Sequence, residues 1–246
     1  MHWILLRGLT REQAHWGDLP ERLAASLPEH RFHTLDLPGT GNRYRDTSPW
    51  TIAGIRQRVA QAAAHIPPPY GLIALSMGGM VALDWAQAEP RGRIQYLVLI
   101  NTSGGFSPPW QRFRPSALPA VVRLLSRREL FDREAGILAL TSNRPVATET
   151  VKRWYSIQRQ RPVSRQNALR QLTAAARYRP RAQRPLPDAL VLASRGDRIV
   201  DWRCSRALEQ RWQWRLQVHP HAGHDLPLDA PDWVVAQIVA YLRGQA

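Results

Sequence analysis

One stretch of the sequence, residues 71–80, constrains the fold more than any other. An apolar run over 71–75 ends at Ser76, and a helical pattern follows it as far as Glu89. This order is typical of a nucleophile elbow, in which a serine occupies a strained turn between a parallel strand and a helix. Such a turn needs small residues two positions before and after the serine, and Ala74 and Gly78 meet that need. A serine that only caps a helix would give the same pattern, so this stretch alone leaves the role of Ser76 open.

Short apolar runs alternate with helical patterns on both sides of this stretch. We expect strands at residues 3–6, 32–36, 71–75, 94–100, 189–193 and 216–218. We expect helices at residues 19–27, 51–65, 77–89, 204–212 and 231–243. Strands that alternate with helices are typical of a parallel sheet with helices on both faces. The predicted fold class is therefore α/β, a doubly wound and mostly parallel sheet of about six strands.

The alternation stops at Phe106 and resumes after Pro187. Between these residues, helical patches are separated by prolines and no convincing strand pattern occurs. We expect residues 106–187 to form a helical, arginine-rich cap. The cap would be inserted into an α/β core made of residues 1–105 and 188–246.

Arginine dominates the charge of the chain. The net charge is +15, and all basic side chains except Lys152 are arginines. Between Gln111 and Arg184 there are 17 basic and 4 acidic residues, a net charge of +13. A GC-rich genome would give the same arginine bias, whereas a basic surface would attract an acidic partner. The arginines are spread over several predicted helices without a nucleic-acid-binding motif, so nucleic acid is not an expected partner.

Other features of the sequence exclude several classes of protein. No apolar run is long enough for a transmembrane helix, which needs about 20 residues, and the N-terminus lacks the pattern of a signal peptide. A single cysteine, Cys204, excludes an internal disulfide. Residues 39–41 lack the third glycine of a dinucleotide fingerprint, and no metal-ligand spacing occurs. We expect a cytoplasmic protein with no transmembrane segment, no metal and no cofactor.

Two residues beyond other predicted strands complete a candidate catalytic set with Ser76. Asp197 follows the strand at 189–193, and His224 follows the strand at 216–218. A serine nucleophile needs a histidine to accept its proton and an acid to orient that histidine. In doubly wound hydrolases these residues occur in the order serine, acid, histidine, which is their order here.

Other residues near the same strand ends are alternative partners for the serine. His219 and His221 are alternative bases, and Asp201 and Asp225 are alternative acids. We prefer His224 because it follows a glycine and lies farther beyond the strand. We expect Asp201 to cap the next helix.

An ester-cleaving site also needs two preorganised N–H donors for the oxyanion. We expect one from the backbone of Met77, the residue after Ser76. The other would come from Leu9, in the turn after the first predicted strand.

Taken together, these motifs resemble those of the α/β-hydrolase family, in its capped esterase and lipase branch. The resemblance implies that Ser76, Asp197 and His224 form a catalytic triad and that Leu9 and Met77 supply the oxyanion hole. The matching segments are Arg7-Gly8-Leu9 with Trp16, and residues 36–41, 74–79, 196–200 and 222–224.

The chain departs from the family pattern in three ways. Arg7 stands where the family often has histidine, and it could alter the oxyanion loop, pair with a substrate carboxylate or anchor the turn through hydrogen bonds. Ala74 replaces the first glycine of the elbow. The first predicted strand corresponds to the third strand of the family, so we expect the N-terminal β-hairpin to be missing.

The predicted activity is hydrolysis of a carboxylic ester or thioester through an acyl-enzyme on Ser76. The alternative is a non-catalytic protein whose basic cap docks an acidic partner, nucleic acid or anionic lipid. In size, cap and motif spacing the chain is similar to the esterases that act on the methyl ester of pimeloyl-acyl carrier protein. This similarity and the basic charge of the cap together predict an acidic acyl-carrier protein or acyl-CoA as partner. Five aromatic residues of the cap are candidates to line an apolar acyl pocket: Trp110, Phe113, Phe131, Trp154 and Tyr155. Further candidate substrate or partner contacts are Arg7, Arg153, Arg159 and Arg165.

Overall fold

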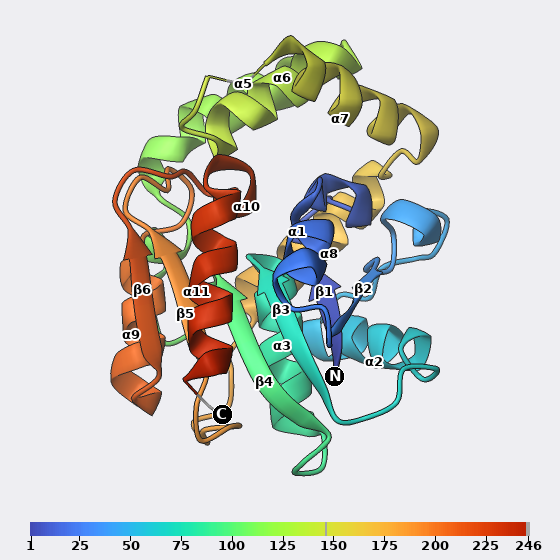
Figure 1. The fold of residues 1–246 in the computed structure, drawn as a ribbon. Coiled ribbons are helices and arrows are strands. Elements are labelled where there is room, and N and C mark those ends of the chain that lie inside the picture. Colours follow the sequence, from blue (N-terminus) through green and yellow to red (C-terminus); the bar gives the residue numbers. More distant parts are fainter. Residues whose placement is uncertain (146, 245–246) are drawn as a thin grey trace.

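Six parallel strands form one sheet in the order β2–β1–β3–β4–β5–β6 (Figure 1). The computed structural model describes residues 1–145 and 147–244. Every predicted strand is confirmed, with no end shifted by more than one residue, and all five neighbouring pairs are parallel. The strands are β1 (His2–Leu6), β2 (Arg31–Leu35), β3 (Tyr70–Leu75), β4 (Ile94–Ile100), β5 (Leu190–Ser194) and β6 (Arg215–His219).

The composition of each strand follows from its place in the sheet. In the interior of the sheet, all of β3 and β5 is buried, so both carry continuous apolar runs. The edge strands β2 and β6 instead expose Arg31, Arg215 and Gln217. The carboxyl ends of all six strands meet at one edge of the sheet, and the loops that follow them gather there.

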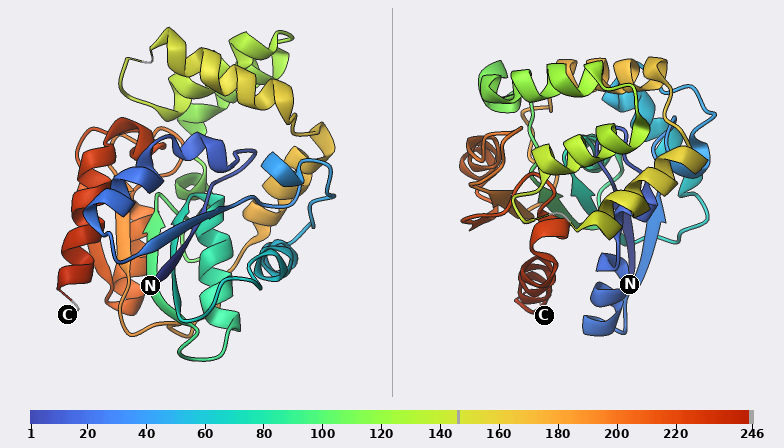
Figure 2. Two further views of the ribbon diagram at one scale, coloured as in Figure 1. Left: turned by 45° about the vertical axis from the view of Figure 1, so that its right-hand side comes forward. Right: turned by 90° about the horizontal axis from the view of Figure 1, so that it is seen from above.

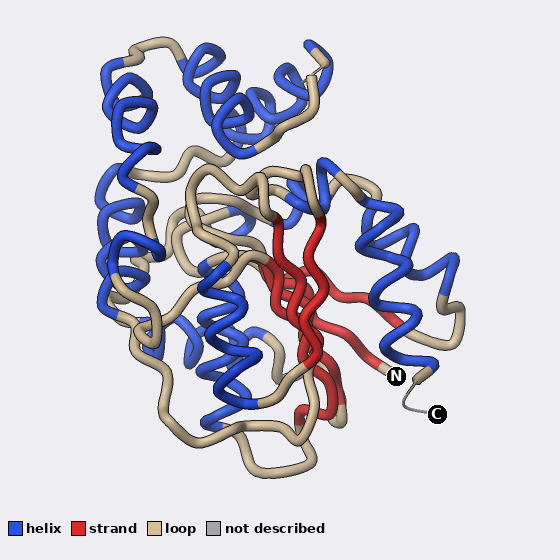
Figure 3. The backbone as a smooth tube through the Cα atoms, turned by 90° about the vertical axis from the view of Figure 1, so that its left-hand side faces the viewer, coloured by secondary structure: helices blue, strands red, loops and turns tan. Residues whose placement is uncertain are grey.

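Helices cover both faces of the sheet (Figure 3). On one face α1 (Leu19–Ser26) and α11 (Pro231–Arg243) pack through Leu23, Val234 and Ile238. On the other face lie α2 (Ile52–Ala62), α3 (Met77–Ala88) and α9 (Arg203–Trp212). The Thr51 side chain begins α2 by accepting a hydrogen bond from the Gly54 N–H.

Between β4 and β5 the described residues form helices joined by loops, and none of them lies in a strand. We call residues 106–187 the insertion. Helices α5, α6 and α7 lie above the carboxyl edge of the sheet, and α8 lies lower, beside the core (Figure 2). The helices are α4 (Pro109–Arg112), α5 (Leu118–Ser126), α6 (Leu130–Thr141), α7 (Thr148–Gln160) and α8 (Arg165–Arg177).

Candidate active site

Ser76 occupies a sharp turn between β3 and α3. Its backbone has a φ of 57°, a value that non-glycine residues rarely adopt, and such strain is often found at functional sites. The two glycines that follow allow α3 to cross its neighbours closely. A Cβ at Gly78 would overlap the backbone oxygen of Arg7, and one at Gly79 would overlap the Thr102 side chain.

A chain of hydrogen bonds joins Ser76 to His224 and His224 to Asp197. The Ser76 Oγ lies 3.0 Å from His224 Nε2, and His224 Nδ1 lies 2.6 Å from Asp197 Oδ2. The other oxygen of Asp197 accepts hydrogen bonds from the backbone N–H groups of Ile199 and Val200, which fixes the carboxylate. A carboxylate can only accept, so Nδ1 carries the proton and Nε2 is left to accept from the serine hydroxyl.

The surroundings of His224 shift its pKa. Burial lowers the pKa of the imidazole, but the nearby Asp197 and Asp225 carboxylates and the Asp197 hydrogen bond outweigh burial. The pKa therefore lies above the ordinary value of 6.5, even though the Arg7 charge also lowers it. The imidazole is stabilised in its protonated form, as required of a base that must take a proton from serine.

The alternative acids and bases have other partners. Asp201 accepts a hydrogen bond from the N–H of Arg203, the first residue of α9, and so holds the start of that helix. His219 accepts two backbone hydrogen bonds through Nδ1, one of them from the N–H of His221.

Arg7 and Asp225 form a buried ion pair next to this hydrogen-bond chain. The Arg7 Nη1 and Nη2 atoms donate to the two oxygens of Asp225 at 3.1 and 2.5 Å. The guanidinium also lies 5.0 Å from the ring centre of Trp16. Asp225 directly follows His224, so the pair ties the loop after β1 to the loop that carries the histidine. A substrate carboxylate could reach Arg7 only by displacing Asp225.

The two expected oxyanion donors lie close to Ser76. Met77 is the first residue of α3, and Leu9 follows Gly8, where an added Cβ would lie 3.0 Å from the Ser76 Cβ. In the part of the chain that the structure describes, the N–H groups of Leu9 and Met77 donate no hydrogen bond to another residue.

The aromatic residues expected to line an acyl pocket fall into two groups. Trp110, Phe113 and Phe131 are exposed, by 63%, 39% and 38%. Trp154 instead is buried, so it packs the insertion against the loop after β1 and does not face an open pocket. Tyr155 packs edge to face on Phe131, with ring centres 5.9 Å apart.

The three arginines expected to contact a partner lie on the surface of the insertion. Arg153 and Arg159 lie on α7, and Arg165 is the first residue of α8. All three are exposed. They are therefore available to a partner that approaches α7 and the start of α8.

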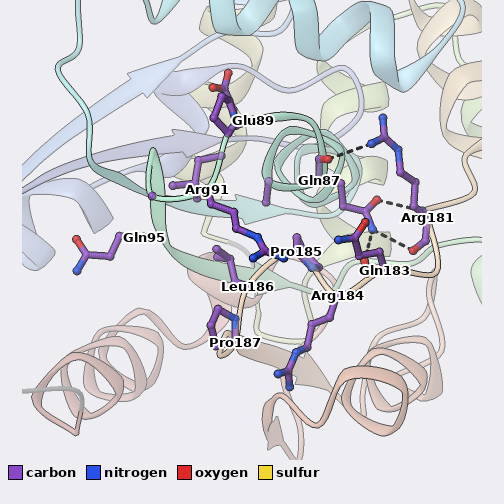
Figure 4. Close-up of a pocket in the computed structure, with 14 residues that line it drawn as sticks. Gln87, Glu89, Arg91, Gln95, Arg181, Gln183, Arg184, Pro185, Leu186 and Pro187 are labelled. Carbon is purple, nitrogen blue, oxygen red and sulfur yellow. Dashed lines mark hydrogen bonds between the residues drawn. The ribbon is translucent and has the colours of Figure 1, made fainter.

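A separate cavity lies at the opposite end of the sheet. It has a volume of about 610 Å³ and is bounded by the end of α3, the start of β4 and residues 181–187 (Figure 4). Gln87 spans one side by donating to the backbone oxygens of Arg181 and Gln183. None of the residues expected at the active site lines this cavity.

Residues 1–145 and 147–244 contain neither a membrane-spanning helix nor a metal-binding cluster. No helix there is long and apolar enough to cross a membrane. No group of three or more histidine, cysteine, aspartate and glutamate side chains within these ranges could hold a metal ion.

The six-stranded parallel sheet, with helices on both faces, is that of an α/β-hydrolase. Residues 3–237 match the Alpha/beta hydrolase family, so the chain belongs to this family and its enzyme class is that of a hydrolase. An esterase from Exiguobacterium antarcticum has a similar structure, with a TM-score of 0.78. The match covers 99% of this chain and 92% of the esterase at 14% sequence identity, which shows the fold alone.

Two curated relatives match different shares of the chain. A putative carbamate hydrolase, RutD, of Cronobacter sakazakii is 28% identical in an alignment of 244 positions that covers 93% of this chain and 85% of RutD. The pimeloyl-[acyl-carrier protein] methyl ester esterase of Yersinia pestis is 32% identical over 125 residues. That match covers 50% of this chain and 45% of the esterase, so the chain spans less than half of this second relative.

Proposed function

We propose that the protein is a serine ester hydrolase with Ser76 as nucleophile, His224 as base and Asp197 as the acid that orients the base. The observation that carries this proposal is the chain of two hydrogen bonds, of 3.0 and 2.6 Å, that joins the three side chains. The direction of these hydrogen bonds suits nucleophilic catalysis, because the unprotonated Nε2 of His224 faces the serine hydroxyl and can accept its proton.

The reaction proceeds in two steps. His224 takes the hydroxyl proton as the Ser76 oxygen bonds to the acyl carbon, and the N–H groups of Leu9 and Met77 stabilise the oxyanion. The proton then passes from His224 to the leaving alcohol or thiol as the acyl–oxygen or acyl–sulfur bond breaks. Water, deprotonated by His224, attacks the acyl-enzyme, releases the carboxylic acid and restores the serine hydroxyl.

The substrate class follows from the insertion, which we propose acts as a cap over the serine. The segment from Gln111 to Arg184 carries a net charge of +13, and its exposed arginines favour an acyl group presented by an acidic carrier. An acyl-carrier protein or acyl-CoA fits this charge. The name of the second relative, a pimeloyl-[acyl-carrier protein] methyl ester esterase, supports the same substrate class.

The first test is hydrolysis of p-nitrophenyl esters with acyl chains of increasing length. The wild type is expected to turn them over, and Ser76→Ala is expected to lose nearly all of this activity while its circular dichroism spectrum stays the same. An aryl carbamate and an acyl-CoA belong in the same panel, because the first relative is named a carbamate hydrolase. Equal rates for the wild type and Ser76→Ala would refute a serine mechanism, and no turnover of any of these substrates by the wild type would favour a non-catalytic docking protein.

The second test concerns the carrier and uses two variants of equal charge. One replaces three exposed arginines of the insertion with glutamate, and the control replaces three exposed arginines of the core. Only the first is expected to raise KM for an acyl-carrier-protein substrate, and added salt should weaken the difference because it screens exposed charges. If both variants changed this KM equally, the arginines of the insertion would have no special role and would reflect the composition of the chain alone. The insertion variant changes Arg153, Arg159 and Arg165, and the core variant changes Arg31, Arg58 and Arg91.

A further inference from the structure

Like Ser76, one residue of the loop after β1 has a strained backbone. It lies two positions after Gly8. Thr10 has a φ of 56°. For a β-branched residue this backbone conformation is a genuine outlier, and it persists only where the surroundings hold it in place. Thr10 directly follows Leu9, the residue proposed to donate its N–H to the oxyanion. Whatever holds Thr10 therefore also acts on the position of that donor.

Two glutamine side chains of the insertion hold the backbone of Thr10. The Thr10 N–H donates to Gln171 Oε1 of α8 at 3.0 Å, and the Thr10 carbonyl oxygen accepts from Gln158 Nε2 of α7 at 3.3 Å. Gln171 also donates from Nε2 to the carbonyl oxygen of Pro38, which fixes the orientation of its amide. Both glutamines are buried, with exposures of 0% and 7%.

Ion pairs reinforce this attachment on the following residues of the loop. Arg11 Nη1 lies 2.7 Å from Glu134 Oε2 of α6, and both residues are buried. Glu12 is paired with Arg161, which directly follows α7. Three consecutive residues of the loop after β1 are thus bound by side chains from the insertion.

We propose that Gln158 and Gln171 are positioning residues that set the direction of the Leu9 N–H and so make the oxyanion hole depend on the seating of the insertion. This inference rests on the proposed function. On one side of Leu9, Gly8 lies so close to Ser76 that an added Cβ would be 3.0 Å from the Ser76 Cβ, and on the other side the two glutamines hold Thr10. Without them, Thr10 would be free to relax to a negative φ, and the chain direction at Leu9 would change.

A loss of this kind acts on the transition state more than on substrate binding. The oxyanion forms only as the serine attacks, so a misdirected donor lowers kcat and leaves KM nearly unchanged. Removing one oxyanion donor costs about 10²–10³ in kcat in serine hydrolases. A donor that is displaced but still present should cost less, on the order of tenfold or more.

Helix α8 offers a matched control for a purely structural role. Asn167 lies one turn before Gln171 on α8 and is also buried, at 6% exposure. Its amide accepts from the Ser48 N–H and donates to the Asp46 carbonyl oxygen, both at 2.9 Å. It therefore joins the insertion to a core loop in the same way as Gln171, but to a loop without an oxyanion donor.

The experiment compares Gln171→Met with Asn167→Leu, two changes that keep side-chain size and remove the hydrogen bonds. Gln171→Met is expected to lower kcat for a p-nitrophenyl ester by at least about tenfold, with KM within about twofold. Asn167→Leu is expected to keep kcat within about twofold at a similar fall in Tm. A boronic acid, which forms a tetrahedral adduct with serine, should lose affinity for Gln171→Met by the same factor as kcat/KM.

A conservative variant and an activity-independent measurement complete the test. Gln171→Glu keeps an acceptor for the Thr10 N–H and is expected to recover part of kcat, including where Gln171→Met fails to fold. Amide hydrogen exchange of Thr10 should accelerate in Gln171→Met and stay unchanged in Asn167→Leu.

Unchanged kcat or exchange in a folded Gln171→Met, or equal losses of kcat in both variants, would overturn the inference. A wild type that hydrolyses no ester better than Ser76→Ala would instead refute the proposed function, and the exchange result would still decide whether Gln171 holds the loop.

Discussion

Replacing Arg7 with methionine would leave the Asp225 carboxylate buried without its cation. The side chains of the pair are only 3% and 4% exposed, and two hydrogen bonds join them. Methionine keeps the aliphatic part of the arginine side chain, so the main losses are the charge of the guanidinium and its two hydrogen bonds. The perturbation therefore measures the cost of an unpaired charge in the interior.

The expected size of this cost follows from burial. Removing one partner of a buried ion pair costs about 3–5 kcal/mol, because the remaining charge is neither solvated nor paired. In a protein of about this size each kcal/mol lowers Tm by roughly 2–4 °C, so the Tm of Arg7→Met should fall by about 6–20 °C. The double variant Arg7→Met/Asp225→Leu removes both charges and should regain most of that loss, since apolar replacement of a whole pair is often neutral.

The same variants should move the pH dependence of activity. The base must be neutral to act, so kcat/KM rises with pH through the pKa of His224. Arg7 lowers this pKa and Asp225 raises it by more. The acidic limb of kcat/KM should therefore shift to higher pH in Arg7→Met and to lower pH in the double variant, relative to the wild type.

Thermal unfolding followed by circular dichroism at pH 7, together with pH profiles on a p-nitrophenyl ester, provides the assay. Arg22→Met is the control, because Arg22 pairs with Asp18 and Asp232 in an exposed position and its loss should hardly change Tm. If Arg7→Met unfolds at the temperature of this control, the argument from a buried charge is wrong. If the double variant loses as much as the sum of both single variants, Arg7 and Asp225 are not coupled.

Three further predictions concern the catalytic residues and the elbow. Asp197→Asn should lower kcat by about 10⁴-fold, because it favours the wrong imidazole tautomer, whereas Asp201→Asn should keep near-native turnover; the reverse result would reassign the acid. The raised pKa of His224 predicts an acidic limb of kcat/KM whose midpoint lies above pH 6.5, and a midpoint at or below 6.5 would contradict the electrostatic argument. Gly78→Ala should destabilise the fold by about 1–3 kcal/mol in chemical denaturation, because its Cβ would overlap the backbone oxygen of Arg7; an unchanged denaturation midpoint would show that the elbow can widen.

Structural features that depend on residues close together in the sequence, such as the strands, could be predicted from sequence patterns. Apolar runs bounded by turn residues locate every strand to within one residue, because strand length and burial depend on residues that are close together in the sequence. The three residues proposed as a triad are recognisable for a related reason. Each follows a predicted strand, and the carboxyl ends of parallel strands share one edge, so chain order alone brings Ser76, Asp197 and His224 to the same region.

Contacts between distant residues leave no such pattern. Arg7 and Asp225 are 218 positions apart, and nothing in either segment indicates the other. Gln158 and Gln171 lie in amphipathic helices, where a glutamine usually faces solvent, so their burial against Thr10 could not be read from spacing. Trp154 was expected near the substrate because aromatic residues line acyl pockets, but a tryptophan in a small helical layer also serves as its core.

The proposed docking of a carrier also depends on contacts that the net charge of the sequence does not reveal. The sequence counts every arginine of the insertion equally, but the structure divides them by what they contact. Arg161 is bound to Glu12 of the core and so holds the insertion in place, whereas Arg112 donates to backbone oxygens at the end of α8 and so joins two helices of the insertion. Arg153 and Arg159 are exposed and available to a partner. Genomic bias would place exposed arginines on the core as well, and some do lie there. The charge of the insertion therefore argues for a carrier only if its exposed arginines act differently from those of the core, which is the comparison that the two charge-reversal variants make.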